Sequence, residues 1–127
     1  MTGRVRDPAR LKVLIVEDEF MLANDVARLF ASKGADIVGF APTVRQARQI
    51  IERGEHIDVA VLDVSLADDE VYEVADLVRE RGACLVFYTA ADASRLPERF
   101  SDAPVVQKTA GVEQIYSAVL RACKPAK

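Results

Sequence analysis

Long apolar runs are missing from this sequence of 127 residues, and none approaches the roughly 20 residues that a helix needs to cross a membrane. Residues 1–10 are polar and arginine-bearing, and no apolar stretch of the kind found in secretory signals follows them. We therefore expect a cytoplasmic protein without membrane insertion. An excess of positive charge is missing too. The net charge is -3, so we expect no nucleic acid or anionic membrane as a partner.

Cysteine and histidine are scarce, with two residues and one residue respectively. Cys84 and Cys123 have no spacing typical of metal ligands, and they fall in a predicted strand and in the tail of a predicted helix. We expect them to be buried or incidental free thiols in a reducing cytosol. His56 precedes a predicted strand and is expected on the surface, so the chain has no evident phosphohistidine donor.

Apolar runs alternate with amphipathic stretches along the chain. Strands are predicted over 11–16, 36–40, 57–62, 84–88 and 104–107, and helices over 18–33, 43–54, 69–81 and 112–123. The first helix should bury a face that includes Met21, and Thr43 can cap the second helix. Asp68, Asp69 and Glu70 are expected at the start of the third helix, where acids are favoured. Pro97 should leave any helix in 91–103 short or broken.

This alternation predicts an α/β fold, a five-stranded parallel sheet that is doubly wound. The strands read as near-continuous apolar runs, as parallel strands covered on both faces do. Half of the residues are hydrophobic, which suffices for the core of one domain. We expect one domain over 11–123, a flexible lead-in over 1–10 and a tail over 124–127. We expect a monomer or weak dimer, and no output domain is evident in the sequence.

Chemically active residues follow the predicted strands. Glu17 and Asp18 follow the first strand, Asp63 the third, Thr89 the fourth and Lys108 the fifth. In open α/β sheets, ligands bind beyond the carboxyl ends of the strands, so we expect these side chains to meet. Carboxylates that close together cannot all stay ionised and unpaired, so either one is protonated or a divalent cation sits among them.

The set fits phosphoryl chemistry centred on Asp63. Its carboxylate can attack phosphorus and form an aspartyl phosphate. Mg²⁺ prefers oxygen ligands, so Asp18 and Asp63 could bind it directly, with Glu17 direct or through water. Lys108 can pair with one phosphoryl oxygen and Thr89 can donate a hydrogen bond to another. Glu19, by contrast, is expected only to favour the dipole of the following helix.

Four segments resemble the receiver domain of two-component response regulators, the CheY-like family. They are 13–19 (VLIVEDE), 61–66 (VLDVSL), 87–90 (FYTA) and 105–108 (VVQK), in the family's order. The resemblance covers about residues 11–123 and implies Asp63 as phosphoacceptor, Glu17 and Asp18 as the acidic pair, and Thr89 and Lys108 as the family's hydroxyl and lysine. It also implies a requirement for Mg²⁺ and a histidine kinase or phosphotransfer protein as donor. The sequence does not name the downstream partner, and the resemblance implies a partner surface formed by the fifth strand and its flanking helices.

Ser65 lies two residues after Asp63. By the resemblance its backbone carbonyl joins the metal ligands, and its side chain could influence water access; a plain loop residue is an equal alternative. A finer likeness is to the FATGUY branch, common as single-domain regulators, although its namesake motif is only partly present. Phe87 and Thr89 fit that motif, and Tyr88 departs from it.

Three positions depart from the family's usual pattern. Val105 stands where most receivers have an aromatic residue that reports phosphorylation, and Phe87 or Tyr88 could substitute for it. Thr109 replaces a proline after the lysine, so we expect either a trans bond with a shifted loop or a strained cis bond. Ala67 follows Leu66 where a proline is usual, which should make that loop more mobile.

Three other functions remain open at this point. A Mg²⁺-dependent hydrolase of small phosphates also uses an aspartyl phosphate, but it usually has a second acid where Ser65 stands. A flavodoxin-like nucleotide binder should have a first loop rich in Ser, Thr and Gly, whereas Glu17, Asp18 and Glu19 would repel phosphate. The third is a receiver that has lost phosphorylation, which the intact acid set opposes. We therefore expect a signalling receiver without enzymatic turnover of its own.

Overall fold

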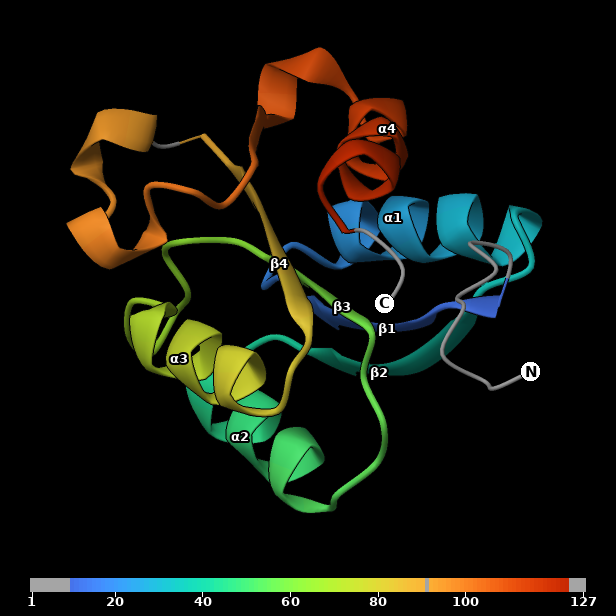
Figure 1. The fold of residues 1–127 in the computed structure, drawn as a ribbon, viewed down its shortest axis with the longest axis horizontal. Coiled ribbons are helices and arrows are strands. Elements are labelled where there is room, and N and C mark those ends of the chain that lie inside the picture. Colours follow the sequence, from blue (N-terminus) through green and yellow to red (C-terminus); the bar gives the residue numbers. More distant parts are fainter. Residues whose placement is uncertain (1–9, 91, 124–127) are drawn as a thin grey trace.

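The computed structural model describes residues 10–90 and 92–123, and the expected lead-in, up to residue 9, and the expected tail lie outside them. Five parallel strands form one sheet in the order β2-β1-β3-β4-β5 (Figure 1). The strands are β1 (Lys12–Val16), β2 (Asp36–Ala41), β3 (Val59–Leu62), β4 (Cys84–Thr89) and β5 (Val105–Gln107). The predicted five-stranded doubly wound fold is confirmed. Within the described residues, none of the helices has the length and apolar character needed to cross a membrane.

Helices cover both faces of the sheet. The helices α1 (Phe20–Ser32) and α4 (Glu113–Ala122) lie on one face, and α2 (Val44–Glu52) and α3 (Tyr72–Glu80) on the other (Figure 1). Successive strand residues point to opposite faces, so each strand supplies both cores. In β1, Leu14 is buried against the α2 and α3 side and Ile15 against the α1 and α4 side. Each such buried side chain contributes about 1.5–3 kcal/mol to folding.

The helix ends follow the predicted signals. Thr43 caps α2, since its hydroxyl accepts a hydrogen bond from the backbone N–H of Gln46 at 3.1 Å. At the end of α1, the N–H of Gly34 donates to Ala31 and the N–H of Ala35 donates to Phe30, with bonds of 2.9 and 3.0 Å. Gly34 has φ 88°, a left-handed conformation that glycine adopts without steric cost, and so it stops the helix.

The prediction that Met21 lies on the buried face of α1 is wrong. Met21 is 79% exposed, and its neighbour Phe20 equally so. The buried stripe of α1 begins at Ala23 and continues through Val26 and Phe30. At 3.6 residues per turn, Met21 lies about 200° around the helix from Ala23 and faces away from the sheet.

The connection from β4 to β5 contains no α-helix in its described part. It forms two short 3₁₀ helices, η2 (Ala93–Arg95) and η3 (Glu98–Phe100), with Pro97 between them. This confirms the predicted broken helix. Phe100 is fully buried, and its ring stacks on Tyr72 of α3 and meets Phe87 of β4 edge-on, at centroid distances of 6.0 and 5.6 Å.

Two arginines fasten the same connection to α3. The guanidinium groups of Arg79 and Arg99 lie 5.2 and 4.6 Å from the centre of the Phe100 ring. Arg79 also donates to the side chain of Asp102 at 2.7 Å, and Arg99 donates two bonds of 3.0 Å to Asp76 of α3. These contacts hold the connection against α3 and, through Phe100, against β4.

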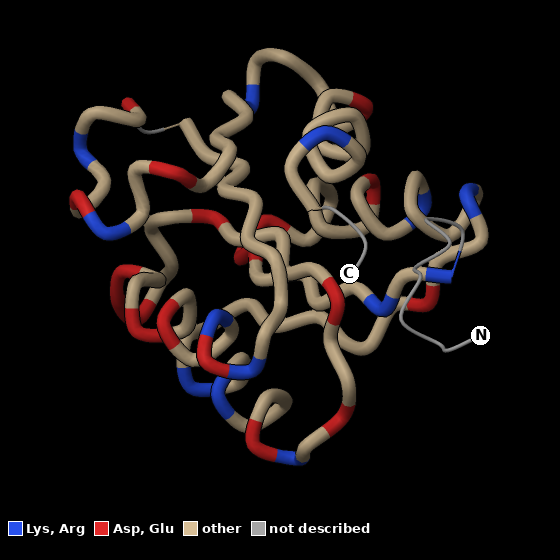
Figure 2. The backbone as a smooth tube through the Cα atoms, in the orientation of Figure 1, with Lys and Arg blue, Asp and Glu red and all other residues tan. Residues whose placement is uncertain are grey.

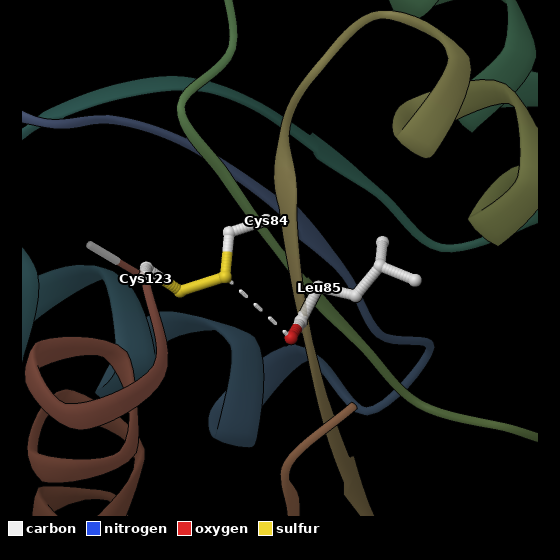
Figure 3. Close-up of a disulfide and its surroundings, with 3 residues drawn as sticks. All are labelled: Cys84, Leu85 and Cys123. Carbon is white, nitrogen blue, oxygen red and sulfur yellow. Dashed lines mark hydrogen bonds between the residues drawn. A yellow bond between two sulfur atoms is a disulfide. The ribbon is translucent and has the colours of Figure 1, made fainter. Parts of the chain in front are cut away.

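The prediction of free thiols is wrong, because Cys84 and Cys123 form a disulfide (Figure 3). Cys84 begins β4 and Cys123 directly follows α4. The chain returns through α4 to the edge of the sheet where β4 starts, which brings the two Cα atoms to 5.7 Å, a normal separation for a disulfide. A separation of 39 residues in sequence gave no sign of this proximity.

Candidate phosphoryl-acceptor site

Three carboxylates meet where β1 and β3 end side by side. Val16 pairs with Leu62 in the sheet, so the residues that follow each strand emerge next to each other. The backbone N–H of Asp63 donates to the carbonyl of Val16 at 2.9 Å and fixes this arrangement. Glu17, Asp18 and Asp63 each offer an oxygen within 4.8 Å of the others. The predicted acidic set is therefore brought together at the switch point of the strand order.

Lys108 lies in the middle of these acids. Its Nζ atom is 3.0 Å from Asp63, 3.1 Å from Glu17 and 3.0 Å from Glu19. Burial lowers the pKa of Lys108, but its hydrogen bonds to Asp63 and Glu19 outweigh this effect and raise the pKa above its ordinary value. The lysine remains a cation and neutralises part of the acidic charge.

Glu19 belongs to the site, and its assignment to the helix dipole alone was incomplete. Its backbone N–H donates to Glu17 at 3.0 Å, which turns the chain back over the pocket and aims the Glu19 carboxylate at Lys108. The side chain is 61% exposed, so it forms the outer rim of the cluster. The spacing of Glu17 and Glu19 was visible in the sequence, but the turn that folds one over the other was not.

Glu17 is the most constrained acid of the set. Burial and the neighbouring charge of Asp63 raise the pKa of Glu17 to about 7, against the lowering effect of the hydrogen bond from Glu19 and of Lys108. Its Oε1 atom is fully buried and, within the described residues, has no hydrogen-bond donor, although Lys108 lies within ion-pair distance. A buried acceptor without a donor is costly. A hard cation bound to Glu17, Asp18 and Asp63 would satisfy it, so the residues fit such an ion.

Asp18 and Thr89 complete the set from two directions. Asp18 is exposed, so its carboxylate reaches the cluster from the solvent side. Thr89 is buried at the end of β4, where it pairs with Gln107, the residue before Lys108. Ser65 is exposed in the loop after Asp63 and forms an isolated antiparallel β-bridge with Glu70. The structure thus places Thr89 at the same edge as Lys108, and the role of Ser65 stays a prediction.

The structure describes two of the positions that depart from the usual receiver pattern, Thr109 and Val105. Among the described residues no peptide bond is cis, so the bond between Lys108 and Thr109 is trans and is followed by a 3₁₀ turn, η4 (Lys108–Ala110). Val105 is half-buried and pairs with Phe87. Phe87 packs on the α2 and α3 side and Tyr88 on the α1 and α4 side, so only Phe87 shares a face with Val105.

The loop after Asp63 is tied to α2 rather than to α3. Asp68 accepts hydrogen bonds from the backbone N–H groups of Val44 and Arg45, at 2.9 and 3.3 Å, which lower the pKa of Asp68. The prediction that Asp68 starts the third helix is wrong, because α3 begins only at Tyr72. A side chain that caps a helix 24 residues earlier in the chain could not be recognised from local sequence.

Basic and acidic positions are interspersed along the described part of the backbone (Figure 2). At the edge of the sheet where the site lies, three carboxylates pair with one lysine, and Asp18 adds a fourth carboxylate beside them. This excess of negative charge favours a cation as a further component of the site.

Comparison with known proteins points to the same class of protein. No family model matches the chain. SdrG of Sphingomonas melonis Fr1 is 32% identical, with coverage of 88% of this chain and 95% of that chain and a TM-score of 0.75. The receiver domain of the response regulator PhyR from Erythrobacter litoralis is 26% identical, with 89% coverage of both chains and a TM-score of 0.76.

Curated relatives agree over shorter spans. The transcriptional regulatory protein PdtaR of Mycobacterium tuberculosis is 31% identical over 107 residues, which are 81% of this chain and 52% of that protein. The sensory transduction protein LytT of Bacillus anthracis is 36% identical over 86 residues, 65% of this chain and 34% of that protein. The chain therefore spans about a third to a half of these relatives. Fold, acid cluster and lysine define a signalling receiver of the phosphoacceptor type. The chain belongs to the response regulator receiver family.

Proposed function

We propose that the chain receives a phosphoryl group on Asp63 from a sensor histidine kinase or a phosphotransfer protein. The observation that carries this proposal is the cluster itself. Asp63 lies 3.0 Å from Lys108 and within 4.8 Å of the ligand atoms of Glu17 and Asp18. A nucleophilic carboxylate, a cation to neutralise the phosphoryl group and acids to hold a metal are the parts that phosphoryl transfer needs.

Mg²⁺ is the proposed cofactor, held by Glu17, Asp18 and Asp63, with the backbone carbonyl of Ser65 as a further ligand. When bound, the metal neutralises charge on the phosphoryl oxygens during transfer. The buried Oε1 atom of Glu17 accepts no hydrogen bond among the described residues and has the Lys108 ammonium 3.1 Å away, which supports this assignment because a bound metal would complete its surroundings. Oxygen ligands alone, and three carboxylates among them, are typical of hard divalent cations.

The chain's own residues divide the remaining work. A carboxylate oxygen of Asp63 forms a bond to phosphorus as the bond between phosphorus and the donor's imidazole nitrogen breaks. Lys108 exchanges part of its contact with Asp63 for a phosphoryl oxygen and remains a cation throughout. Thr89 donates its hydroxyl to a second phosphoryl oxygen. Lys108 and Thr89 lie at the ends of neighbouring strands, which supports this division.

The proposed output is the binding of a downstream protein in the cytoplasm or onward transfer of the phosphoryl group, by a monomer or weak dimer, rather than enzymatic turnover. A phosphatase of small molecules would need a general acid two residues after its nucleophile. Ser65 stands there, and a hydroxyl with an ordinary pKa is a poor acid. Turnover is therefore limited to slow loss of the phosphoryl group from Asp63.

The test is intact mass after incubation with acetyl phosphate and Mg²⁺. We expect a single phosphoryl adduct on the wild type, none on Asp63→Asn and none when the metal is chelated. Asp69→Asn, an exposed acid of the following loop, is the matched control and should accept the phosphoryl group as the wild type does. A wild type that stays unmodified contradicts the proposal. Sustained hydrolysis of p-nitrophenyl phosphate would instead favour a phosphatase.

A further inference from the structure

The disulfide lies at the end of the sheet where the strands begin, and the acid cluster lies at the opposite end, where the strands finish. Cys84 is the first residue of β4, whereas Thr89 at the other end of the same strand borders the phosphoryl-acceptor site. Cys123 follows the last residue of α4 (Figure 3). The covalent bond therefore fastens the C-terminal end of α4 to the sheet, at a distance from the chemistry of Asp63.

The two cysteines are held by the protein to different extents. Cys84 is part of the sheet, where it pairs with Val59 and its N–H donates to the carbonyl of Asp58 at 2.9 Å. Among the described residues, Cys123 makes one backbone hydrogen bond, from its N–H to Val119 at 2.8 Å, and its side chain is only partly buried against the core on the α1 and α4 side. If the disulfide opens, Cys84 keeps its place and Cys123 is the residue that can move.

Both sulfur-bearing residues can be reached from outside. Cys84 and Cys123 are half-buried and line a cavity of about 360 Å³, together with Leu11, Ile57 and Ala122. The reduced state is also accommodated. The Sγ atom of Cys84 lies 3.9 Å from the carbonyl oxygen of Leu85 (Figure 3). A disulfide sulfur carries no hydrogen to donate, but the thiol formed on reduction would find an acceptor there.

We propose that Cys84 and Cys123 form a thiol–disulfide redox site whose reduction releases the C-terminal end of α4. The reductant is a small thiol of the glutathione class. Its thiolate attacks one sulfur, the bond between Cys84 and Cys123 breaks, and a mixed disulfide forms. A second thiol resolves it, leaving two cysteine thiols and one oxidised glutathione. Two electrons and two protons have then passed to the protein, and oxidised glutathione reverses the reaction.

Reduction should loosen only one end of the helix. Ile115, Ala118 and Val119 of α4 are buried and keep the helix packed on the sheet. The last turn, which ends at Ala122, has no buried residue beyond Val119 among those described and loses its covalent anchor. A disulfide that closes a loop of this length constrains the unfolded chain, so its loss should lower the Tm by roughly 10 °C.

The chemical test is alkylation of the native protein by iodoacetamide after equilibration in glutathione buffers, read by intact mass. We expect no alkylation in oxidised glutathione and two alkylated cysteines in reduced glutathione. Returning the reduced protein to oxidised glutathione should restore full protection. Two reactive thiols in the oxidising buffer, or glutathione adducts in place of the internal bond, would overturn the proposal.

The structural test is amide hydrogen exchange in the two states. Exchange at Leu120, Arg121 and Cys123 should become at least tenfold faster on reduction, while the amides of β4 stay protected. The variant Cys84→Ser/Cys123→Ser should show the fast exchange in both buffers, and Cys84→Ala/Cys123→Ala replaces it if serine at the partly buried Cys84 prevents folding. Equal exchange in the oxidised and reduced wild type refutes the release of α4.

The same samples separate this inference from the proposed function. Phosphoryl acceptance from acetyl phosphate should differ by less than twofold between the oxidised and reduced proteins, because the two sites lie at opposite sheet edges. An absent adduct in both states counts against Asp63 as acceptor and leaves the alkylation result untouched. A large difference between the states would show that the disulfide reaches the acid cluster, and would overturn the local release described here.

Discussion

Substituting Glu17 by glutamine tests the electrostatics of the site in a protein free of metal. Burial and the charge of Asp63 raise the pKa of Glu17 from 4.5 to about 7. At about 1.4 kcal/mol for each factor of ten in proton affinity, ionising this buried acid costs roughly 3 kcal/mol of folding free energy before solvent screening reduces it. Glu17→Gln keeps the shape and one oxygen acceptor but removes the ionisation.

The pH dependence fixes the sign of the expected effect. Between the unfolded pKa near 4.5 and the folded value of about 7, the folded protein binds more protons at Glu17 than the unfolded chain does. This contribution to stability is present below pH 4.5 and is lost as the pH rises through about 7. In EDTA at pH 8, Glu17→Gln should therefore be more stable than the wild type by up to about 3 kcal/mol, and at pH 5 the two should differ little.

Urea unfolding at the two pH values, with and without Mg²⁺, measures this difference. Mg²⁺ should stabilise the wild type and stabilise Glu17→Gln less, since one ligand is lost. Glu19→Gln is the control, because its exposed side chain should change stability by less than about 1 kcal/mol. If Glu17→Gln is no more stable than the wild type at pH 8 without metal, Lys108 already satisfies the ionised Glu17, and the argument for a missing cation fails.

Three further predictions concern single contacts. Asp68→Ala should lower the Tm by a few degrees and speed hydrogen exchange at Val44, because the first turn of α2 loses the acceptor for the N–H groups of Val44 and Arg45 while the Thr43 cap remains; unchanged exchange would contradict the capping role. Phe100→Ala should cost about 3–5 kcal/mol in urea unfolding, whereas Phe20→Ala at an exposed position should cost less than about 0.5 kcal/mol, and equal effects would place Phe100 outside the core. Lys108→Ala should slow phosphorylation of Asp63 by acetyl phosphate at least tenfold, measured by intact mass over time, and an unchanged rate would remove Lys108 from the transfer step.

The fold could be predicted because its signals are local and repeated. Apolar runs of strand length alternate with helical periods, and Thr43 and Gly34 mark helix ends through chemistry that acts within a few residues. The acid cluster followed from the same reasoning, since parallel strands bring the residues after them to one edge. Because Asp63 directly follows a strand parallel to the one that precedes Glu17, the two acids were expected to lie close together, as they do.

Two features that could not be predicted from the sequence arise from contacts between segments far apart in the chain. The cap that Asp68 gives α2 and the bond between Cys84 and Cys123 each join residues that local patterns treat separately. The prediction for Met21 was wrong for another reason. An apolar residue near the start of a helix is compatible with several choices of which helix face is buried. Packing of the helix against the sheet determines which face is buried, and in α1 the buried face includes Ala23 and not Met21.

Phe100 has a mechanical consequence for the strand that ends at Thr89. Its ring packs between Phe87 of β4 and Tyr72 of α3, and the guanidinium groups of Arg79 in α3 and Arg99 in its own turn lie close to it. A displacement of β4 at the phosphoryl-acceptor edge would reach β5 directly through the strand pairing of Phe87 and Thr89, and it would also press on Phe100 through Phe87. The position of α3 should therefore respond to a change at Thr89 through Phe87, Phe100 and Tyr72, in addition to the response of β5.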